Sequence, residues 1–208
     1  MHQRVEYEQA AYALGKNYII GLDEAGRGPM AGPLVVGAVI FEKGYTNDLI
    51  NDSKQLTEAR REYLYDVITQ DALAYQIEII EVDEVDRLNV YQASKKGMLD
   101  AIKHISIHPD YALSDAMPLG NAIEHQAIIK GDSLSISIAA ASILAKVTRD
   151  RIMKTYDLIY PEYGFAKHKG YPTKQHKEAL KNHGVTPIHR RSFQPVIDVL
   201  NEQLSLKL

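Results

Sequence analysis

The sequence predicts an α/β protein with a mixed five-stranded sheet flanked by helices and a helical appendage at the C-terminal end. Strand-like segments come first, strands then alternate with helices, and only helices follow about residue 156. The 208 residues are 45% hydrophobic and 25% charged, which are ordinary values for a folded domain. We expect a single domain over 1–208, with a sheet body at about 18–155 and a basic helical part at about 156–208.

Five segments have the apolar, partly β-branched character of strands, and three of them alternate with a period of two. They span residues 18–23, 33–41, 75–82, 111–113 and 127–129. Asp23 is the last residue of the first segment, and Asp115 and Asp132 follow the last two segments within a few positions. The sequence therefore predicts carboxylates where buried strands end.

Five helices are predicted between and after these strands. One begins at Glu58 after a capping Thr57, and another is capped by Thr173 and stops at Gly184. The others span about 85–105, 138–156 and 193–204. Small residues near the start of the 138–156 helix would let it approach a sheet closely.

Composition excludes several classes of protein. The chain has no cysteine, so a disulfide framework, a thiolate zinc site and a cysteine nucleophile are excluded. The longest apolar stretch, 136–145, is too short to span a bilayer, and charges interrupt the N-terminal segment where a signal peptide would be apolar. We expect a cytoplasmic protein, and a monomer by default.

Charge is unevenly distributed along the chain. Residues 146–191 hold eleven Lys and Arg against four Asp and Glu, whereas the remainder holds 13 basic and 23 acidic residues. Ring-bearing side chains are interleaved with these cations: Tyr156, Tyr160, Tyr163, Phe165, His168, Tyr171 and His176. This mixture is typical of nucleic-acid grooves, although a solvated helical surface is also basic.

The motif GLDEAGRGPMAGP, residues 21–33, is rich in glycine. Its Gly-x-Gly-x-x-x-Gly spacing and the strand predicted after it exclude a dinucleotide-binding loop, and no Gly-Lys-Ser/Thr phosphate loop is present. What remains is an acidic pair, Asp23 and Glu24, entering a loop whose amides can approach a ligand because glycines flank Arg27. A solvated acidic loop is the alternative interpretation.

Four acids are expected at one edge of the sheet: Asp23, Glu24, Asp115 and Asp132. Two carboxylates about 4 Å apart repel by roughly 4 kcal/mol at an effective dielectric near 20, so folding would require a cation among them. Oxygen ligands without His or Cys favour Mg²⁺ or Mn²⁺ over zinc. The acids therefore predict a divalent metal site.

Five motifs resemble, in order and spacing, those of the bacterial type 2 ribonuclease H family, ribonuclease HII. They are GLDEAGRGPMAGP, NDSKQL, IIKGDSLSISIAAASILAKVTRDRIM, YGFAKHKGYPTKQH and PIHRRSF, within residues 18–196. The resemblance implies a ribonuclease H-like fold and metal-dependent endonucleolytic cleavage of RNA in RNA/DNA hybrids. It also implies nicking 5′ to single ribonucleotides in duplex DNA, with 5′-phosphate and 3′-hydroxyl products. The Gly-Arg-Gly motif and the short segment before the first strand fit type 2 better than the related type 3 family.

The resemblance assigns the catalytic and metal-binding roles to Asp23, Glu24, Asp115 and Asp132. Many relatives have Gly after the third acid, where this chain has Ala116, and Asp110 is a nearby competitor that lies in a turn. Two Mg²⁺ or Mn²⁺ ions about 3.5 to 4 Å apart would flank the scissile phosphate, activating water and neutralising the leaving 3′ oxygen. Asp150 is expected to be a structural or capping acid.

The resemblance also implies how a ribonucleotide is recognised. The backbone of Gly26, Arg27 and Gly28 would bond the 2′-hydroxyl, and Tyr171 would stack on the next sugar and favour deoxyribose there. The alternative is that Tyr171 is a turn residue filling a gap under Pro172. The candidates for phosphate contact are Lys54, Lys146, Arg149, Lys167 and Lys169.

The C-terminal residues Gln203 to Leu208 resemble the Gln-Leu-x-Leu peptides with which bacterial replication and repair proteins dock on the sliding clamp. The alternative is the frayed end of the last helix. We expect RNA/DNA hybrids and ribonucleotide-containing duplex DNA as partners. For the whole chain, the alternative to an enzyme is a non-catalytic nucleic-acid-binding protein with a structural metal site, against which four phosphate-repelling acids argue.

Overall fold

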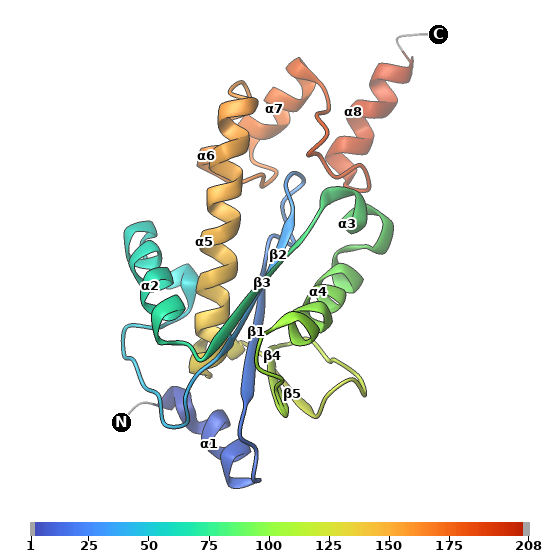
Figure 1. Ribbon diagram of the computed structural model, residues 1–208. Coiled ribbons are helices and arrows are strands. Elements are labelled where there is room, and N and C mark those ends of the chain that lie inside the picture. The colour runs from blue at the N-terminus through green and yellow to red at the C-terminus, as the bar shows by residue number, and fades with distance from the viewer. Residues whose placement is uncertain (1–2, 206–208) are drawn as a thin grey trace. The chain divides into compact units, whose positions relative to one another are not determined.

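The computed structural model describes residues 3–205 and contains a five-stranded sheet in the order β3-β2-β1-β4-β5 (Figure 1). β1 pairs antiparallel with β2 and parallel with β4, and β4 pairs parallel with β5. The strands are β1 (Ile19–Ala25), β2 (Leu34–Ile40), β3 (Ala74–Ile80), β4 (Tyr111–Asp115) and β5 (His125–Ile128). The predicted mixed sheet with flanking helices is confirmed.

The described helices include those that the sequence predicts. They are α1 (Glu6–Ala13), α2 (Glu58–Asp71), α3 (Val82–Leu88), α4 (Val90–His104), α5 (Ile136–Ile159), α6 (Phe165–His168), α7 (Lys174–His183) and α8 (Gln194–Ser205), with short 3₁₀ turns η1 (Gln3–Val5), η2 (Ser53–Gln55) and η3 (Gly131–Ser133). Both predicted caps form, because Thr57 Oγ1 accepts from Arg60 N at 3.3 Å and Thr173 Oγ1 from His176 N at 3.2 Å. Within residues 3–205 no helix is both long enough and apolar enough to cross a membrane.

Two features differ from the predicted helices. The helix expected over 85–105 is broken between α3 and α4 by Asn89, whose φ is 68°. The Asn89 side chain accepts hydrogen bonds from Tyr91 N and Gln92 N, so it caps the start of α4. The amphipathic signal of α1 is weak, and the sequence did not predict this helix.

The chain divides into two compact units. The sheet unit comprises Met1–Ala25, Val35–Ile79 and Ser94–Val147. The C-terminal unit comprises Gly26–Leu34, Ile80–Ala93 and Thr148–Leu208. The glycine loop thus belongs to the same unit as the basic helical part of the chain, although the two are far apart in sequence.

In the sheet unit, helices cover both faces of the sheet, with α2 and the first half of α5 on one face and α4 on the other (Figure 1). Leu64 and Ile68 of α2 share one buried cluster with Val39 of β2 and the alanines of α5. The helix approaches β2 so closely that a methyl group at Gly37 would lie 2.2 Å from the carbonyl oxygen of Ala141. The predicted close approach of a small-faced helix to the sheet is therefore confirmed.

The C-terminal unit has its own aromatic core, which corrects one expectation from the sequence. Tyr163 and Phe165 stack with ring centroids 5.2 Å apart and are buried, as are His168 and His176. These rings pack among Met30, Met153, Leu180 and Val196 instead of lining an open groove. Of the interleaved rings, Tyr171 is exposed, with 46% of its surface accessible. The ring-bearing residues among the cations therefore mostly form the core of the C-terminal unit, because a unit of this size needs apolar surface to bury.

Candidate acidic centre and glycine loop

Three of the predicted acids meet at one edge of the sheet. The register pairs Leu22 with Ser114, so Asp23 and Asp115 follow at neighbouring positions on parallel strands. Asp132 joins them from η3, just after β5. One carboxylate oxygen from each of the three lies within 4.8 Å of the others, and Asp23 and Asp132 are both only 4% exposed. The strand-end prediction is thus sufficient to locate this acidic centre.

Asp115 occupies the predicted position, whereas Asp110, the alternative candidate for the third acid, has a structural role. Asp115 Oδ1 accepts a hydrogen bond from Gly131 N at 2.8 Å, which ties β4 to the turn carrying Asp132. Ala116 has a φ of 50°, a left-handed conformation that costs a glycine nothing and an alanine a modest strain. Asp110 accepts from the backbone amides of Asn17 and Tyr18 instead, so it fixes the chain where β1 begins.

Electrostatic strain is concentrated on Asp23. Burial raises the pKa of this carboxyl well above its usual range, and the negative charges of Glu24 and Asp115 raise the pKa further. Hydrogen bonds from Ser142 and from the Glu24 amide oppose these effects. Glu24 is the next residue on β1 but lies outside the close group of three that the described residues form. A buried carboxylate among like charges is stabilised by a cation.

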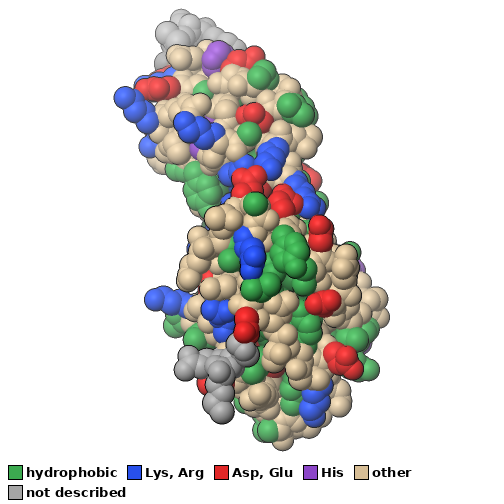
Figure 2. Space-filling model, turned by 90° about the vertical axis from the view of Figure 1, so that its left-hand side faces the viewer, with side chains coloured by type: hydrophobic (Ala, Val, Ile, Leu, Met, Phe, Trp, Pro, Cys, Tyr) green, Lys and Arg blue, Asp and Glu red, His purple; other side chains and the backbone are tan. Residues whose placement is uncertain are grey.

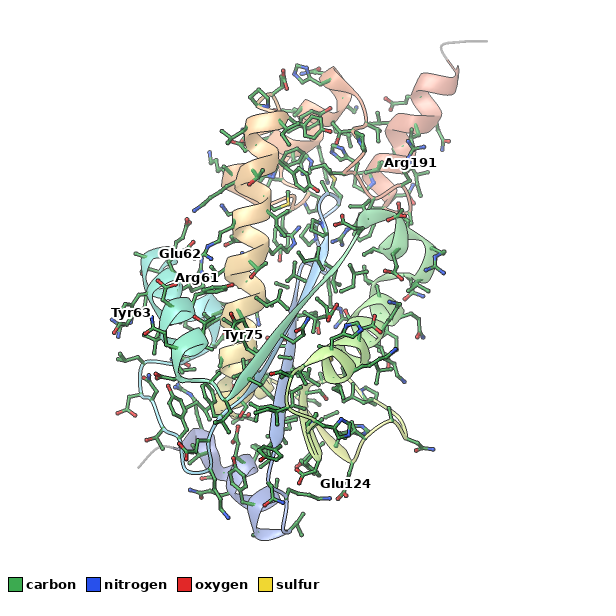
Figure 3. The ribbon with its side chains drawn as sticks, viewed as in Figure 1. Arg61, Glu62, Tyr63, Tyr75, Glu124 and Arg191 are labelled. Atoms are coloured by element: carbon green, nitrogen blue, oxygen red, sulfur yellow. The ribbon has the colours of Figure 1, made fainter. Side chains whose placement is uncertain are left out.

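Polar side chains from the NDSKQL motif reach this centre. Lys54 Nζ lies 2.9 Å from Asp132 Oδ2, although the Lys54 side chain remains 73% exposed. Ser53 Oγ lies 2.9 Å from Ser142 Oγ, which itself contacts Asp23. Arg61 on α2 (Figure 3) donates to the carbonyl oxygens of Ser53 and Leu56 and so holds the motif in place. The roles of Ser142 and Arg61 were not predicted, because neither lies in an acidic or glycine-rich pattern.

The donor set fits a hard divalent cation. Three carboxylates converge without any thiolate or imidazole among them, and oxygen ligands of this kind suit Mg²⁺ and Mn²⁺. The raised pKa of Asp23 supports the same conclusion, because a cation would return this carboxyl to its charged form.

In the C-terminal unit, the glycine loop is held by a buried arginine. Arg190 is 0% exposed and donates from Nη2 to the Gly26 carbonyl at 2.6 Å and from Nη1 to the Arg27 carbonyl at 3.3 Å. Its Nε donates to Gly32 O at 3.0 Å. Gly26 has a φ of +103°, which favours glycine at this position. The loop is therefore a rigid feature of the unit.

Tyr171 lies directly beside this loop. A methyl group at Gly28 would lie 3.3 Å from Cε1 of Tyr171, so the exposed ring covers the glycine. The predicted recognition residues Gly26, Arg27, Gly28 and Tyr171 thus belong to one compact unit. Sequence reasoning did not find Arg190, although its motif, PIHRRSF, carried part of the resemblance.

The predicted phosphate contacts have diverse environments. Arg149 is 1% exposed, and its guanidinium donates to the backbone carbonyls of Ala31, Pro33 and Lys169. A side chain buried in this way supports the loop, so the expectation that Arg149 meets phosphate at the surface is corrected. Lys169 Nζ bends back to the Ala166 carbonyl, and Lys146 is half-buried on α5.

On the face that Figure 2 presents, surface charge gives no separate indication of a binding site. Lys167 is exposed, as expected for a solvated or phosphate-binding lysine. Figure 2 shows Lys and Arg side chains interspersed with Asp and Glu on the face that it presents. Part of the basic excess of residues 146–191 is not on the surface, because Arg149 and Arg190 are buried.

Comparison with known proteins assigns the chain to a family. A family model described as Ribonuclease HII matches residues 20–196. A protein of Acholeplasma laidlawii named ribonuclease HII is 51% identical over 196 residues, which are 94% of this chain and 96% of that protein.

Two solved structures are similar over most of their length. The ribonuclease H2 of Pyrococcus horikoshii OT3 has a TM-score of 0.78 and 27% identity, covering 89% of this chain and 98% of that one. The ribonuclease HII of Archaeoglobus fulgidus, solved in a complex with PCNA, has a TM-score of 0.70 and 25% identity, covering 83% and 92%. The alternative of a non-catalytic binding protein is thus not supported. The chain belongs to the ribonuclease HII family, and it is a metal-dependent endoribonuclease of the ribonuclease H type.

Proposed function

We propose that the protein hydrolyses the RNA strand of RNA/DNA hybrids and nicks duplex DNA on the 5′ side of single ribonucleotides, leaving 5′-phosphate and 3′-hydroxyl ends. The observation that carries the proposal is the convergence of Asp23, Asp115 and Asp132, whose carboxylate oxygens lie within 4.8 Å of one another. Carboxylates so close to one another repel phosphate unless cations lie between them, and a hydrolase of phosphodiesters uses such cations.

Asp23, Glu24, Asp115 and Asp132 would hold two divalent ions, Mg²⁺ or Mn²⁺. Such ions supply Lewis acidity, which lowers the pKa of an attacking water and stabilises charge on phosphate oxygens. The residues themselves have simpler tasks. Gly131 N fixes the Asp115 carboxylate, Ser142 orients Asp23, and Lys54 neutralises part of the charge on Asp132.

The C-terminal unit would recognise the ribonucleotide. In this proposal the backbone of Gly26, Arg27 and Gly28 bonds the 2′-hydroxyl, and Tyr171 stacks on the following sugar. The exposed Tyr171 ring beside Gly28 supports this assignment. A site that pairs a hydroxyl rejects the analogue without it by about 10⁴ to 10⁵, which is sufficient to protect ordinary DNA.

The substrate class is tested with four labelled duplexes of one sequence: all DNA, DNA with one ribonucleotide, RNA/DNA hybrid and all RNA. With Mg²⁺ or Mn²⁺ we expect one nick 5′ to the single ribonucleotide, several cuts in the hybrid RNA and no cut in all-DNA duplex. EDTA should abolish both reactions. Cleavage of the all-DNA duplex at a comparable rate would contradict the proposal.

A sliding clamp is the proposed protein partner, through Gln203 to Leu208. Residues 206–208 of this segment lie outside the described residues, and the proposal rests on the sequence QLSLKL. The complex of the Archaeoglobus fulgidus ribonuclease HII with PCNA supports a clamp as the kind of partner. In a pull-down with the clamp, the full chain should bind and a chain ending at Glu202 should not. Equal recovery of both would contradict the proposal.

A further inference from the structure

The dipeptide His189–Arg190, from the PIHRRSF motif, is linked to both parts of the proposed ribonucleotide-reading surface, to the glycine loop directly and to Tyr171 through His176. Arg190 binds the carbonyls of Gly26 and Arg27, whereas His189 Nε2 lies 3.1 Å from Nε2 of His176. His176 Nδ1 in turn lies 2.9 Å from the carbonyl oxygen of Tyr171. Two adjacent residues thus connect the glycine loop to the tyrosine through a short chain of hydrogen bonds that includes His176.

The hydrogen bonds allow one protonation pattern for the two rings. A carbonyl can only accept, so His176 Nδ1 carries a proton and, in a neutral ring, its Nε2 accepts from His189 Nε2–H. From the other side, the Thr186 amide can only donate, so His189 Nδ1 accepts from it at 3.1 Å. Thr186 Oγ1, 2.8 Å away, is a second donor to the same nitrogen. Both ends of the chain of bonds therefore require the same two neutral tautomers.

Burial keeps these rings neutral. It lowers the pKa of His176 to about 4, and burial together with the nearby His176 lowers the pKa of His189 to about 3. Both residues are at most 1% exposed. The tautomer pattern is thus stable at neutral pH.

Tyr171 is fixed at both backbone groups. Its amide donates to His168 O at 2.9 Å, and its carbonyl accepts from Thr173 N at 2.8 Å as well as from His176. The His168 and His176 rings stack with centroids 4.4 Å apart. The backbone of Tyr171 therefore cannot shift without breaking contacts to His176, while its ring remains exposed.

Arg190 sets the direction of the loop amides. In a planar trans peptide the C=O and N–H bonds point in opposite directions. Because the Gly26 and Arg27 carbonyls point at Arg190, the amides of Arg27 and Gly28 point away from it. A third link joins the two parts, since Met30 N donates to Gly170 O and Arg190 N donates to Met30 O, each at 2.9 Å.

We propose that His189 and Arg190 are positioning residues that lock the glycine loop and Tyr171 into one reading surface, and so set the preference for a ribonucleotide followed by a deoxyribonucleotide. This inference rests on the proposed function, because it assumes that the loop reads the 2′-hydroxyl and that Tyr171 reads the next sugar. Neither residue needs to touch the substrate.

The test is a substrate ratio. It divides kcat/KM for a duplex with one ribonucleotide by kcat/KM for the same duplex with four consecutive ribonucleotides. We expect His189→Gln and Arg190→Lys to lower this ratio about tenfold, toward the value of Tyr171→Ala. Adding His189→Gln to Tyr171→Ala should have little further effect, because coupled residues act non-additively. General loss of stability would lower both rates together and leave the ratio unchanged.

Matched controls are available in the same unit. Arg191, in the turn before α8 (Figure 3), and His183 are exposed, so Arg191→Lys and His183→Gln should keep the wild-type ratio. Thr186→Val removes one donor to His189 and preserves shape, so it should lower the ratio severalfold even if the His189 and Arg190 variants fold poorly. Calorimetric titration with Mn²⁺ should be unchanged in every variant, because the acidic centre is built from other residues.

Two outcomes would overturn the proposal, and they are distinguishable. If wild-type protein cuts with a ratio above one and the Thr186, His189 and Arg190 variants keep that ratio, the positioning role is wrong and the proposed function stands. If the wild-type protein fails to nick at a single ribonucleotide, or shows no preference for a following deoxyribonucleotide, the proposed recognition of the sugar is wrong. The positioning role, which rests on that recognition, is then wrong as well.

Discussion

Lys54 Nζ lies 2.9 Å from Oδ2 of the buried Asp132, so an ammonium group neutralises part of the charge of the acidic centre. A divalent ion that binds Asp132 must compete with this contact. The same ammonium, largely exposed, is available to a phosphate once it leaves the carboxylate.

Lys54→Gln is therefore expected to affect metal and substrate in opposite directions. Removing the competing cation should tighten Mn²⁺ binding by roughly three- to tenfold, because the site becomes more negative. The KM for a hybrid duplex should rise, because a phosphate contact is lost. Calorimetry and steady-state kinetics measure the two effects, with Lys103→Gln on the exposed surface of α4 as control. Weaker Mn²⁺ binding by Lys54→Gln would contradict the competition.

Asp23→Asn should stabilise the metal-free protein. Burial and the charges of Glu24 and Asp115 disfavour the ionised carboxylate, and an amide removes that strain. In EDTA the midpoint of thermal unfolding should rise by a few degrees, which corresponds to about 1 kcal/mol. Adding Mn²⁺ should stabilise the wild type but not the variant. Asp198→Asn, at an exposed position of α8, should match the wild type. A lower midpoint for Asp23→Asn in EDTA would show that the acid is not strained.

Two glycines of the loop should respond differently to alanine. At Gly26 a methyl group would lie 2.3 Å from Arg149 Nε, and the φ of +103° is strained for alanine, so Gly26→Ala should lose about 2 kcal/mol or more of unfolding free energy. Gly28→Ala should keep its stability within about 0.5 kcal/mol, because the exposed Tyr171 ring can move slightly. Its cleavage at a single ribonucleotide should nevertheless fall. Urea unfolding and kinetics separate the two effects, and equal loss of stability would contradict the geometry.

The histidine contacts predict a loss of stability in acid. Burial lowers the pKa of His176 to about 4 and of His189 to about 3, against about 6.5 in the unfolded chain. Below pH 6.5 the unfolded chain binds protons that the folded chain does not. The stabilisation is therefore complete above pH 6.5 and decreases, by on the order of a few kcal/mol, as the pH falls toward 4.

Urea unfolding at pH 7 and pH 4.5 measures this change. His189→Gln lacks one of the buried rings whose pKa is lowered, so its unfolding free energy should differ less between the two pH values than that of the wild type. Identical pH dependence in both proteins would contradict the account.

The acidic centre could be predicted from sequence because strand ends are readable. Asp23, Asp115 and Asp132 each close or follow an apolar segment, and parallel pairing of β1 with β4 brings them to one edge. The next residue, Ala116, has a φ of 50°, a backbone conformation that favours glycine. The local sequence pattern and a simple strand topology were sufficient to locate the acidic centre.

The loop scaffold could not be predicted in this way. Arg149 and Arg190 are as basic as any surface residue, yet their partners, Pro33 and Gly26, lie 116 and 164 residues away in the chain. Burial of a cation depends on carbonyls gathered by the tertiary fold, and charge counting does not detect it. The same reason explains why Tyr163 and Phe165 were expected near nucleic acid and instead form a core.

The most direct test of the account is cleavage of a DNA duplex containing one ribonucleotide, with Mn²⁺, by wild type, Asp23→Asn and Asp198→Asn. We predict a single nick 5′ to the ribonucleotide by wild type and Asp198→Asn. For Asp23→Asn we predict a rate about a thousandfold lower, equivalent to about 4 kcal/mol of transition-state stabilisation. Cleavage by Asp23→Asn at the wild-type rate would contradict the claim that the acidic centre carries the reaction.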